Sequence, residues 1–374
     1  MNLKIINVDS RRHLKQYIHL PAFIHKGHKN WIPPLYYEEW LYYNPKKNKA
    51  FNYCDTILLL AILDGKPVGR IMGIINRKYN QEHNELTARF CHWETIDDFG
   101  VASALVKAIE VWAKDRGMKR LIGPMGFSDK DPQGLLVEGF DEPIVISSNC
   151  NYRYQIDYVE KLDYQKDIDL VVYKVPVPKE LPDFYKRILE RVKRNANVYR
   201  MISLKSRGEI KPWIRPVLTL VNETFTNIYG FNPMDFDEMD EFAKRYLAIL
   251  DPRFIKIIVD SENRVLAFIL GIADIGSGIQ KSRGYLFPLG FIHILRSARR
   301  AKMLSLLLGA IHPNYRNLGF DTWLGAEMLS EAHRAGITSI DSHLELETNL
   351  KMRAEMEKMG GMVYKRYRIF QKQL

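Results

Sequence analysis

The sequence predicts a protein of the α/β (α+β) class built from two similar halves, each a mixed, mostly antiparallel sheet flanked by helices. Three observations support this prediction. A β-hairpin pattern occurs twice, an amphipathic helix and a strand follow each copy, and a proline-rich segment, Val175–Pro182, separates the two. The 374 residues suffice for two hydrophobic cores. We therefore expect domains at residues 1–178 and 179–374.

Each hairpin is predicted from two aliphatic and β-branched runs around a turn. In the first half, Thr56–Leu63 and Val68–Ile75 flank an Asp-Gly turn at Gly65. In the second half the runs are Phe254–Val259 and Val265–Ala273. Because consecutive hairpin strands pair with each other, these runs should form two antiparallel pairs.

The helix after each hairpin is predicted from apolar residues at helical spacing. In the first half these residues are Val101, Leu105, Ala108 and Trp112, and strand Arg120–Gly123 follows. In the second half, helix Asp321–Arg334 ends near Gly336, and strand Thr338–Leu344 follows. Both halves close with a helix and a strand, at Tyr154–Leu162 and Ile168–Val175, and at Leu350–Met359 and Met362–Gln371.

The composition favours anionic partners. Lys and Arg exceed Asp and Glu by 55 to 44, giving a net charge of +11. Such an excess suits nucleic acid, anionic lipid or a phosphorylated cofactor. Three widely spaced cysteines provide neither a disulfide framework nor a zinc cage, and the N-terminus lacks the apolar core of a signal peptide. We therefore expect no metal, a cytoplasmic location and no transmembrane segment.

Residues 302–321 contain the most specific pattern in the chain. The apolar run Met303–Ile311 predicts a strand buried on both faces, and Arg316-Asn-Leu-Gly319-Phe-Asp leads directly into the next helix. The first N–H groups of a helix lack intrahelical partners and carry partial positive charge. Gly319 would let an anion approach this backbone closely, and Arg316 would add a forked donor. The pattern therefore predicts a phosphate site.

This strand, Arg-x-x-Gly turn and helix resemble the pyrophosphate-binding turn of the GNAT superfamily of N-acyltransferases. The resemblance covers most of Phe254–Gln371, including Asn349 before the last helix, and extends more weakly over Thr56–Val175. It implies two tandem GNAT-like domains and acyl-CoA or acetyl-CoA as co-substrate. The residues it implies for cofactor binding are Ile311, His312, Arg316, Asn317, Leu318, Gly319, Phe320 and Asn349.

Three positions depart from the family pattern. Asp321 stands where the family usually has a small residue, and a carboxylate there would repel a pyrophosphate. Met356 stands where the family often has a tyrosine that protonates the leaving thiolate. In the first half, the acidic segment Glu94–Gly100 replaces the anion turn. We therefore expect the first half to be non-catalytic.

Direct attack of an amine on the thioester requires a base. Glu345 and Glu347, two residues apart on a predicted strand, are candidates, and so is His312 beside the anion turn. Ordinary solvated carboxylates and a polar histidine at a strand end remain the alternatives. Tyr364 or Tyr367 could protonate the leaving thiolate, although strand tyrosines are usually packing residues.

Two further segments bear on the substrate. In Tyr285–Lys302, an apolar stripe is predicted along Phe287, Phe291, Ile294 and Leu295, and a basic cluster of Arg296, Arg299, Arg300 and Lys302 stands at one end. This composition suits a helix lying on anionic lipid, and a core helix is the alternative. The aromatic, proline-rich Pro21–Pro45 would form a pocket wall, an interfacial belt or a cover for the first sheet.

Together these features predict an acyl-CoA-dependent N-acyltransferase acting on a small amine or on a lipid amine such as a long-chain base. Trp31–Pro34 and the basic C-terminus resemble the tandem GNAT-like branch that includes bacterial ceramide synthases. The lipid acceptor would bring the protein to the inner face of the membrane. A non-catalytic binding module and an aminoacyl-tRNA-dependent transferase remain alternatives, although nucleic acid is disfavoured because no long helical arm is predicted.

Overall fold

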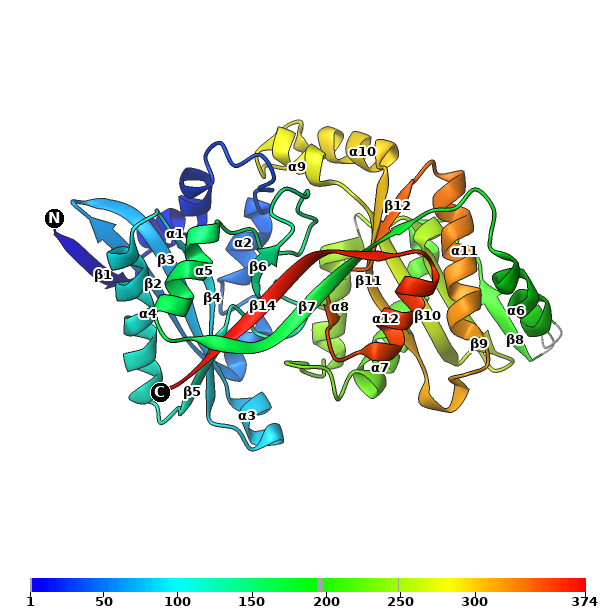
Figure 1. Ribbon diagram of the computed structural model, residues 1–374, viewed down its shortest axis with the longest axis horizontal. Helices are drawn as coiled ribbons and strands as arrows, with labels where there is room; N and C mark the ends of the chain where they lie inside the picture. The colour runs from blue at the N-terminus through cyan, green and yellow to red at the C-terminus, as the bar shows by residue number, and fades with distance from the viewer. Residues whose placement is uncertain (1, 194–197, 248) are drawn as a thin grey trace.

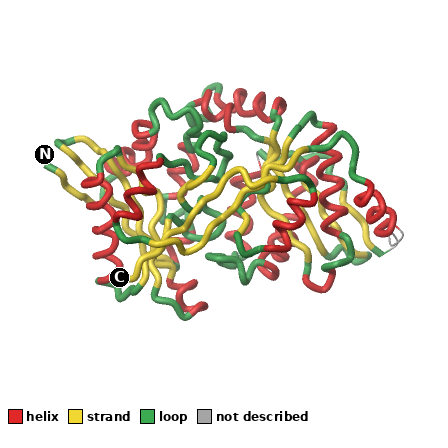
Figure 2. The backbone as a smooth tube through the Cα atoms, in the orientation of Figure 1, coloured by secondary structure: helices red, strands yellow, loops and turns green. Residues whose placement is uncertain are grey.

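The computed structural model describes residues 2–193, 198–247 and 249–374. Its strands form one sheet that runs through the whole molecule, with helices on both faces (Figures 1 and 2). The strands are β1 Leu3–Asn7, β2 Cys54–Leu63, β3 Lys66–Asn76, β4 Thr87–Thr95, β5 Arg120–Gly123, β6 Leu135–Glu138, β7 Gln165–Pro176, β8 Tyr199–Ile202, β9 Ile255–Asp260, β10 Val265–Ala273, β11 Met303–Ile311, β12 Ser339–Asp341, β13 Glu345–Leu346 and β14 Met362–Gln373.

Among the described strands, only β4 with β5 and β11 with β12 pair in parallel. The mixed, mostly antiparallel sheet is therefore confirmed. The helices are α1 Arg11–Ile24, α2 Tyr36–Tyr42, α3 Arg77–His83, α4 Phe99–Lys114, α5 Arg153–Lys161, α6 Asp183–Lys193, α7 Ile214–Thr224, α8 Phe236–Leu247, α9 Gly276–Ser282, α10 Gly290–Arg300, α11 Phe320–Arg334 and α12 Leu350–Lys358.

The two halves exchange their last strands. The sheet order is β1-β2-β3-β4-β5-β14-β7-β12-β11-β10-β9-β8. The C-terminal strand β14 thus pairs with β5 of the first half, and β7 pairs with β12 of the second. Strands β7 and β14 also pair with each other across the middle of the molecule (Figure 1). The boundary at residue 178 stays a prediction, and the sheet itself has no break there.

The helices of the second half cover opposite faces of its sheet. Ile257 and Val259 pack in one hydrophobic cluster with α7 and α8, whereas Ile258 packs in another with Phe320 and Leu324 of α11. Successive strand residues point to opposite faces, so α7 and α8 lie on one side of the sheet and α11 on the other. Helix α12 packs with α11 through Met356.

The helices predicted from periodicity are confirmed. In α4, Val101, Leu105 and Trp112 are buried, and the Asp98 side chain caps the helix by accepting the N–H of Val101 at 3.0 Å. In α11, the buried residues include Leu324, Met328 and Ala332, as the 3.6-residue period predicts.

Two strand predictions were wrong in detail. Strand β11 is not buried on both faces: Leu306, Leu307 and Leu308 are only half-buried, because this stretch borders a pocket instead of a filled core. The strand expected at Thr338–Leu344 ends at Asp341, because His343 adopts a left-handed conformation with φ +60°. A positive φ ends the extended backbone that a strand requires.

Candidate active site

The parallel strands β11 and β12 separate in the centre of the second half. Their pairing ends at Ser305 with Asp341, after which β11 continues while the other chain turns at His343. Ser305 is fully buried, and its Oγ has no hydrogen-bond partner among the described residues. The splay between the strands therefore opens beside a small side chain whose hydroxyl is available.

A polar cluster closes one side of the splay. The Tyr364 hydroxyl donates to Asp341, and the ammonium group of Lys365 lies 3.8 Å from the same carboxylate. Lys365 Nζ also donates to the carbonyl of Pro143 at 2.9 Å. Burial, followed by the nearby Asp341, raises the pKa of Tyr364 well above its usual range. Tyr364 is thus held by a carboxylate and keeps its proton.

An apolar pocket lies between the splay and the α7–α8 face. It encloses about 1320 Å³, including space open to solvent. Phe268, Leu270, Leu307, Leu308, Leu344 and Leu346 line its sheet side. Ligand pockets typically combine such apolar walls with a few polar groups, and here the polar groups include Lys130, Ser147 and His343. The pocket suits an aliphatic chain.

The predicted anion turn lies on the other face of the sheet, where β11 leads into α11. Arg316, Asn317 and Leu318 are exposed, and Gly319 is the N-cap of the helix at φ +84°. Among the described residues, the N–H groups of residues 320–322 have no acceptor. The turn therefore offers unpaired donors to solvent.

Gly319 has a second role that its sequence context did not reveal. A Cβ atom at this position would lie 3.0 Å from the methyl groups of Ile188 and Val192 on α6. The glycine thus allows α6 to pack against the turn, in addition to permitting the positive φ. Asp321, in the first turn of α11, is exposed to solvent.

Two further predicted residues, Asn349 and Glu347, lie near the start of α12. Asn349 caps α12, where its side chain accepts the N–H of Met352, and its amide lies 3.4 Å from Glu345 Oε2. Glu345 lies on β13, which pairs with the central strand β7. Glu347 instead pairs with Lys166 at 2.8 Å and accepts the N–H of Asp169.

His312 lies at the end of β11, where its Nδ1 accepts the N–H of Asn314. Tyr367 is fully buried in the central cluster. These positions place His312 near the anion turn and Tyr367 away from solvent.

Register fixes the side on which Glu345 lies. Glu345 pairs with Val171, and Leu346 pairs with Leu170. Val171 packs with α11 and α12, whereas Leu170 lines the apolar pocket. Paired residues point to the same face, so Glu345 faces the side of the anion turn. Burial raises its pKa to about 8, which leaves the carboxyl largely protonated at neutral pH.

His343 is a site residue that the sequence analysis missed. It lines the apolar pocket, and its Nδ1 is buried without a partner among the described residues. Its backbone N–H donates to Asp341 Oδ1 at 2.8 Å. Burial lowers the pKa of the imidazole, so the ring is neutral and able to accept a proton. Alternation along a strand would place residues 343 and 345 together; the positive φ at His343 separates them.

A second, polar pocket lies in the first half, below α1 and α2. Arg70, His92 and Glu94 line it together with the segment Ile32–Leu35. Arg70 donates to Glu94 at 3.1 Å, and Glu94 Oε2 is buried without a partner among the described residues. Lys130, Ser147 and Tyr246 line both pockets, so the two cavities share a wall.

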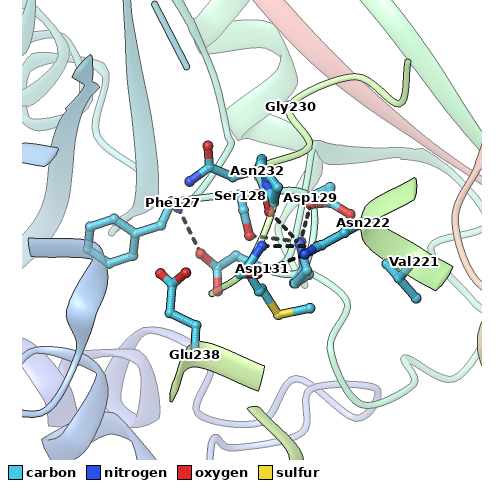
Figure 3. A network of polar contacts seen from close by, with 12 residues as sticks. Phe127, Ser128, Asp129, Asp131, Val221, Asn222, Gly230, Asn232 and Glu238 are labelled. Carbon is cyan, nitrogen blue, oxygen red and sulfur yellow. Dashed lines mark hydrogen bonds and ion pairs between the residues drawn. The ribbon is translucent and has the colours of Figure 1, made fainter. Parts of the chain in front are cut away.

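Figure 3 shows a polar network around Asp129, Asp131 and Asn232, which are close in sequence or bonded to Lys130 of this wall. Lys130 Nζ donates to Asp129 Oδ1 at 3.0 Å and to the carbonyl of Asn232 at 3.1 Å. Asp131 Oδ2 accepts the N–H of Phe127 at 2.7 Å. The side chains of Asp129 and Lys130 are about nine-tenths buried. The loop after β5 is thereby fixed to the loop before α8, which joins the two halves.

Among the described residues, one group has the composition of a metal site: His25, His28 and Cys150. The Nδ1 atoms of the two histidines are 3.0 Å apart. The sulfur of Cys150 lies 3.7 and 3.9 Å from the two nitrogens of His28. Burial raises the pKa of the thiol to about 12. A structural zinc site takes four protein ligands, and this group offers three.

No protein-family model matches the chain. Two curated relatives match over nearly their whole length. The bacterial ceramide synthase of Caulobacter vibrioides is 27% identical over 380 residues, covering 100% of this chain and 98% of that protein. Protein YghO of Escherichia coli is 27% identical over 372 residues, covering 98% and 94%.

Solved structures of GNAT proteins, one of them a tandem GNAT protein, have the same fold. A tandem GNAT protein from the clavulanic acid biosynthesis pathway gives a TM-score of 0.57 at 11% identity, covering 100% of this chain and 98% of that one. A GCN5-related N-acetyltransferase from Sphaerobacter thermophilus gives 0.52 at 13% identity, covering 99% and 95%. The chain therefore has the tandem GNAT fold.

Proposed function

We propose that the protein transfers the acyl group of an acyl-CoA directly to a primary amine, without a covalent acyl-enzyme. One observation carries this proposal. The apolar pocket lies on one face of the sheet beside the β11–β12 splay, and the unpaired N–H groups of α11 lie on the other face. A thioester has the same division, with an aliphatic chain on one side of its carbonyl and a phosphorylated carrier on the other.

In this proposal, residues Arg316–Phe320 bind the CoA pyrophosphate. The N–H groups at the start of α11 and the Arg316 guanidinium supply the donors. Asn349, Ile311 and His312 flank the path from the turn to the splay. The acyl chain enters the pocket lined by Leu307, Leu308 and Leu346.

The two titratable groups at the splay suit opposite proton transfers. The amine nitrogen attacks the thioester carbonyl, a C–N bond forms, and the C–S bond breaks. We assign His343 as the base that accepts the amine proton, because it lines the pocket and is neutral. We assign Glu345 as the acid that protonates the thiolate, because it faces the CoA side and keeps its proton to about pH 8. Environments that push two pKa values apart are the usual way to divide these roles.

The acceptor we favour is a lipid amine such as a long-chain base. The apolar pocket supports this choice, and so does the relative named as a bacterial ceramide synthase. None of the described helices is long and apolar enough to cross a bilayer. Because a lipid amine resides in a bilayer, the proposal includes peripheral contact with an anionic membrane, at its cytoplasmic face.

The test uses the purified chain with palmitoyl-CoA or acetyl-CoA, each combined with sphinganine or spermidine. Free CoA thiol and the amide product are measured together. We expect palmitoyl-CoA with sphinganine to give one amide for each thiol released. CoA binding without amide formation in any combination would identify a binding module instead. Better turnover with acetyl-CoA and spermidine would favour a soluble amine, and an acylated protein after denaturation would contradict direct attack.

A further inference from the structure

We propose that α9, α10 and the loop between them form, with the α1–α2 region, a docking surface for an anionic lipid bilayer. Membrane contact as such belongs to the proposed function, and the inference here concerns which surface makes the contact and which pocket it serves. The surface is defined by seven exposed apolar and aromatic residues: Phe23, Tyr37, Tyr285, Phe287, Leu289, Phe291 and Leu295.

Exposed large apolar residues concentrate in this region. The seven make up half of the fourteen such residues in the described chain, and five of them lie within residues 285–295. Phe287 is 80% exposed, and Leu289 is 60% exposed. Single exposed apolar residues are normal, but a contiguous patch marks an interaction surface.

Apolar and basic residues of α10 lie along one solvent-exposed face of the helix. Phe291, Leu295 and Arg299 follow at four-residue spacing, and all three are exposed. Ile294 is buried and holds the opposite face against Leu35 and Ile279. The prediction of an apolar stripe is thus corrected at Ile294, which belongs to the core. The helix is positioned by its inner face, and its outer face has no cover from the rest of the described chain.

The charge of the segment identifies the partner. Residues 276–302 contain six Lys and Arg and no Asp or Glu. Among the described residues, none of the six forms an ion pair with the protein's own carboxylates. An apolar patch beside unpaired basic side chains matches the interface of an anionic bilayer, in which apolar groups enter the acyl region while cations meet the headgroups.

The α1–α2 region is joined to this surface by aromatic contacts. The ring of Tyr36 lies 4.9 Å from that of Tyr285 and 4.2 Å from that of His19. Phe23 follows His19 by four residues on α1 and is exposed on the same side. The backbone also connects the two regions, because the N–H of Tyr36 donates to the carbonyl of Gly284 at 3.1 Å.

The surface lies directly over the polar pocket of the first half. Ile279 of α9 and the segment Ile32–Leu35 line that pocket, and Ile32 and Leu35 pack with α9 and α10 on their other side. Figure 1 shows α9 and α10 bridging the two halves above this region. A docked bilayer would therefore meet the roof of the polar pocket, which shares its wall with the apolar pocket. Resting on the proposed function, we infer that the amine headgroup of a lipid enters through this polar pocket.

Co-sedimentation with vesicles tests the surface without reference to activity. We expect the protein to bind vesicles of equal parts phosphatidylcholine and phosphatidylglycerol, but not pure phosphatidylcholine, and salt to weaken the binding. Changing Arg296, Arg299 and Arg300 together to Glu should reduce the partition coefficient by at least about tenfold. Phe287→Asp should also reduce it.

Matched changes on α4 and in the loop that follows it serve as controls. Reversal of the exposed Lys107, Lys114 and Lys119 to Glu removes the same charge, and Val111→Asp places a carboxylate on an exposed apolar site. These variants should bind like the wild type. Equal loss in both sets would show that net charge alone drives binding and would overturn the proposal, as would failure to bind anionic vesicles. A concentration-dependent dimer that Phe287→Asp abolishes would assign the surface to a second copy of the chain.

The inference about entry has its own readout. With sphinganine embedded in anionic vesicles, the Arg-to-Glu variant should lose turnover in parallel with vesicle binding. With a short-chain soluble analogue of sphinganine, its turnover should equal that of the wild type. Loss with both substrates would place these arginines in catalysis and would overturn the docking role. Absence of turnover in the wild type would contradict the proposed function and leave the vesicle-binding result standing.

Discussion

The two halves place different side chains on the same framework. Arg89 and Ser305 occupy corresponding positions, each in the last parallel pair before the strands separate. Arg89 fills its splay and donates to the carbonyls of Gly126 and Phe127 at 3.2 and 3.0 Å. Ser305 leaves its splay open. An ordered guanidinium thus closes the first splay, and in the proposed function it is the second splay that admits the thioester.

The N-terminus of the helix after each splay is also blocked in the first half and open in the second. Asp98 caps α4 with its side chain, whereas Gly319 caps α11 without one. The Asp98 carboxylate repels an anion by its charge, and it already accepts the Val101 N–H that an anion would use. The paired strands differ too: the cross-strand pair Arg70 and Glu94 in the first half corresponds to Phe268 and Ala310 in the second. If the second half binds acyl-CoA as proposed, a few side chains account for the difference between the two halves.

The largest effect should come from His343, which has no counterpart in the first half. His343→Gln keeps a polar side chain but removes the basic nitrogen, and we expect kcat to fall on the order of 10²–10⁴-fold. Thermal-shift binding of palmitoyl-CoA should stay unchanged. His312→Gln, which alters the histidine at the end of β11, should retain most activity. A full loss in His312→Gln with normal turnover in His343→Gln would reverse the assignment.

The pH dependence should report Glu345. Its carboxyl can donate a proton only below about pH 8, so kcat/KM, corrected for the ionisation of the amine, should fall as the pH rises through 8. Glu345→Gln should remove this descending limb and lower kcat by about tenfold or more. Tyr364→Phe, whose hydroxyl is held by Asp341, should preserve the limb. A limb that survives in Glu345→Gln would contradict the assignment.

Stability offers an independent measure of the same carboxyl. The folded pKa of Glu345 lies above its usual value of 4.5, so the native state binds the proton more tightly than the unfolded state does. This contribution to the free energy of unfolding is complete below pH 4.5 and is lost as the pH rises through 8. Urea unfolding at several pH values should therefore show a smaller decline in Glu345→Gln than in the wild type.

Local pattern was sufficient for much of the fold. The hairpins β2–β3 and β9–β10 and helices α4 and α11 follow from periodicity and turn residues, because neighbouring residues determine them. The exchange of β7 and β14 was not predictable in this way. Both strands alternate or run apolar as any buried strand does, and nothing in their sequences specifies which half they enter.

The site was partly accessible from sequence for the same reason. The turn at Gly319 and the acidic pair near β13 carry local signals, whereas His343 depends on a positive φ that no turn dipeptide announced. The sequence offered one signal for His343: it follows a short strand, in a stretch whose polar and apolar residues otherwise alternate. The role of α6 in packing against Gly319 joins residues more than 120 positions apart and required the structure.

A smaller effect should distinguish the charges at the anion turn. Arg316→Ala should weaken CoA binding by at least about tenfold, because a charge-assisted hydrogen bond contributes on the order of 1.5–3 kcal/mol. Asp321→Asn should tighten it severalfold, since an exposed carboxylate beside the pyrophosphate is removed. Calorimetry measures both. Gly319→Val is a poorer probe, because its side chain would also clash with Ile188 and Val192. Weaker binding in Asp321→Asn would show that the carboxylate supports the turn.

The smallest effect concerns the half that we expect to lack a CoA site. Asp98→Ala removes the cap of α4 and should lower the free energy of unfolding by about 1 kcal/mol, measured by urea denaturation. It should leave CoA binding at one equivalent per chain, because Arg89 still closes the splay and Glu94 still faces the polar pocket. If calorimetry found two equivalents in the wild type, the first half would hold a cofactor despite its acidic cap. If a second equivalent appeared only in Asp98→Ala, the cap alone would have blocked the site, and the closed splay would have no part in excluding CoA.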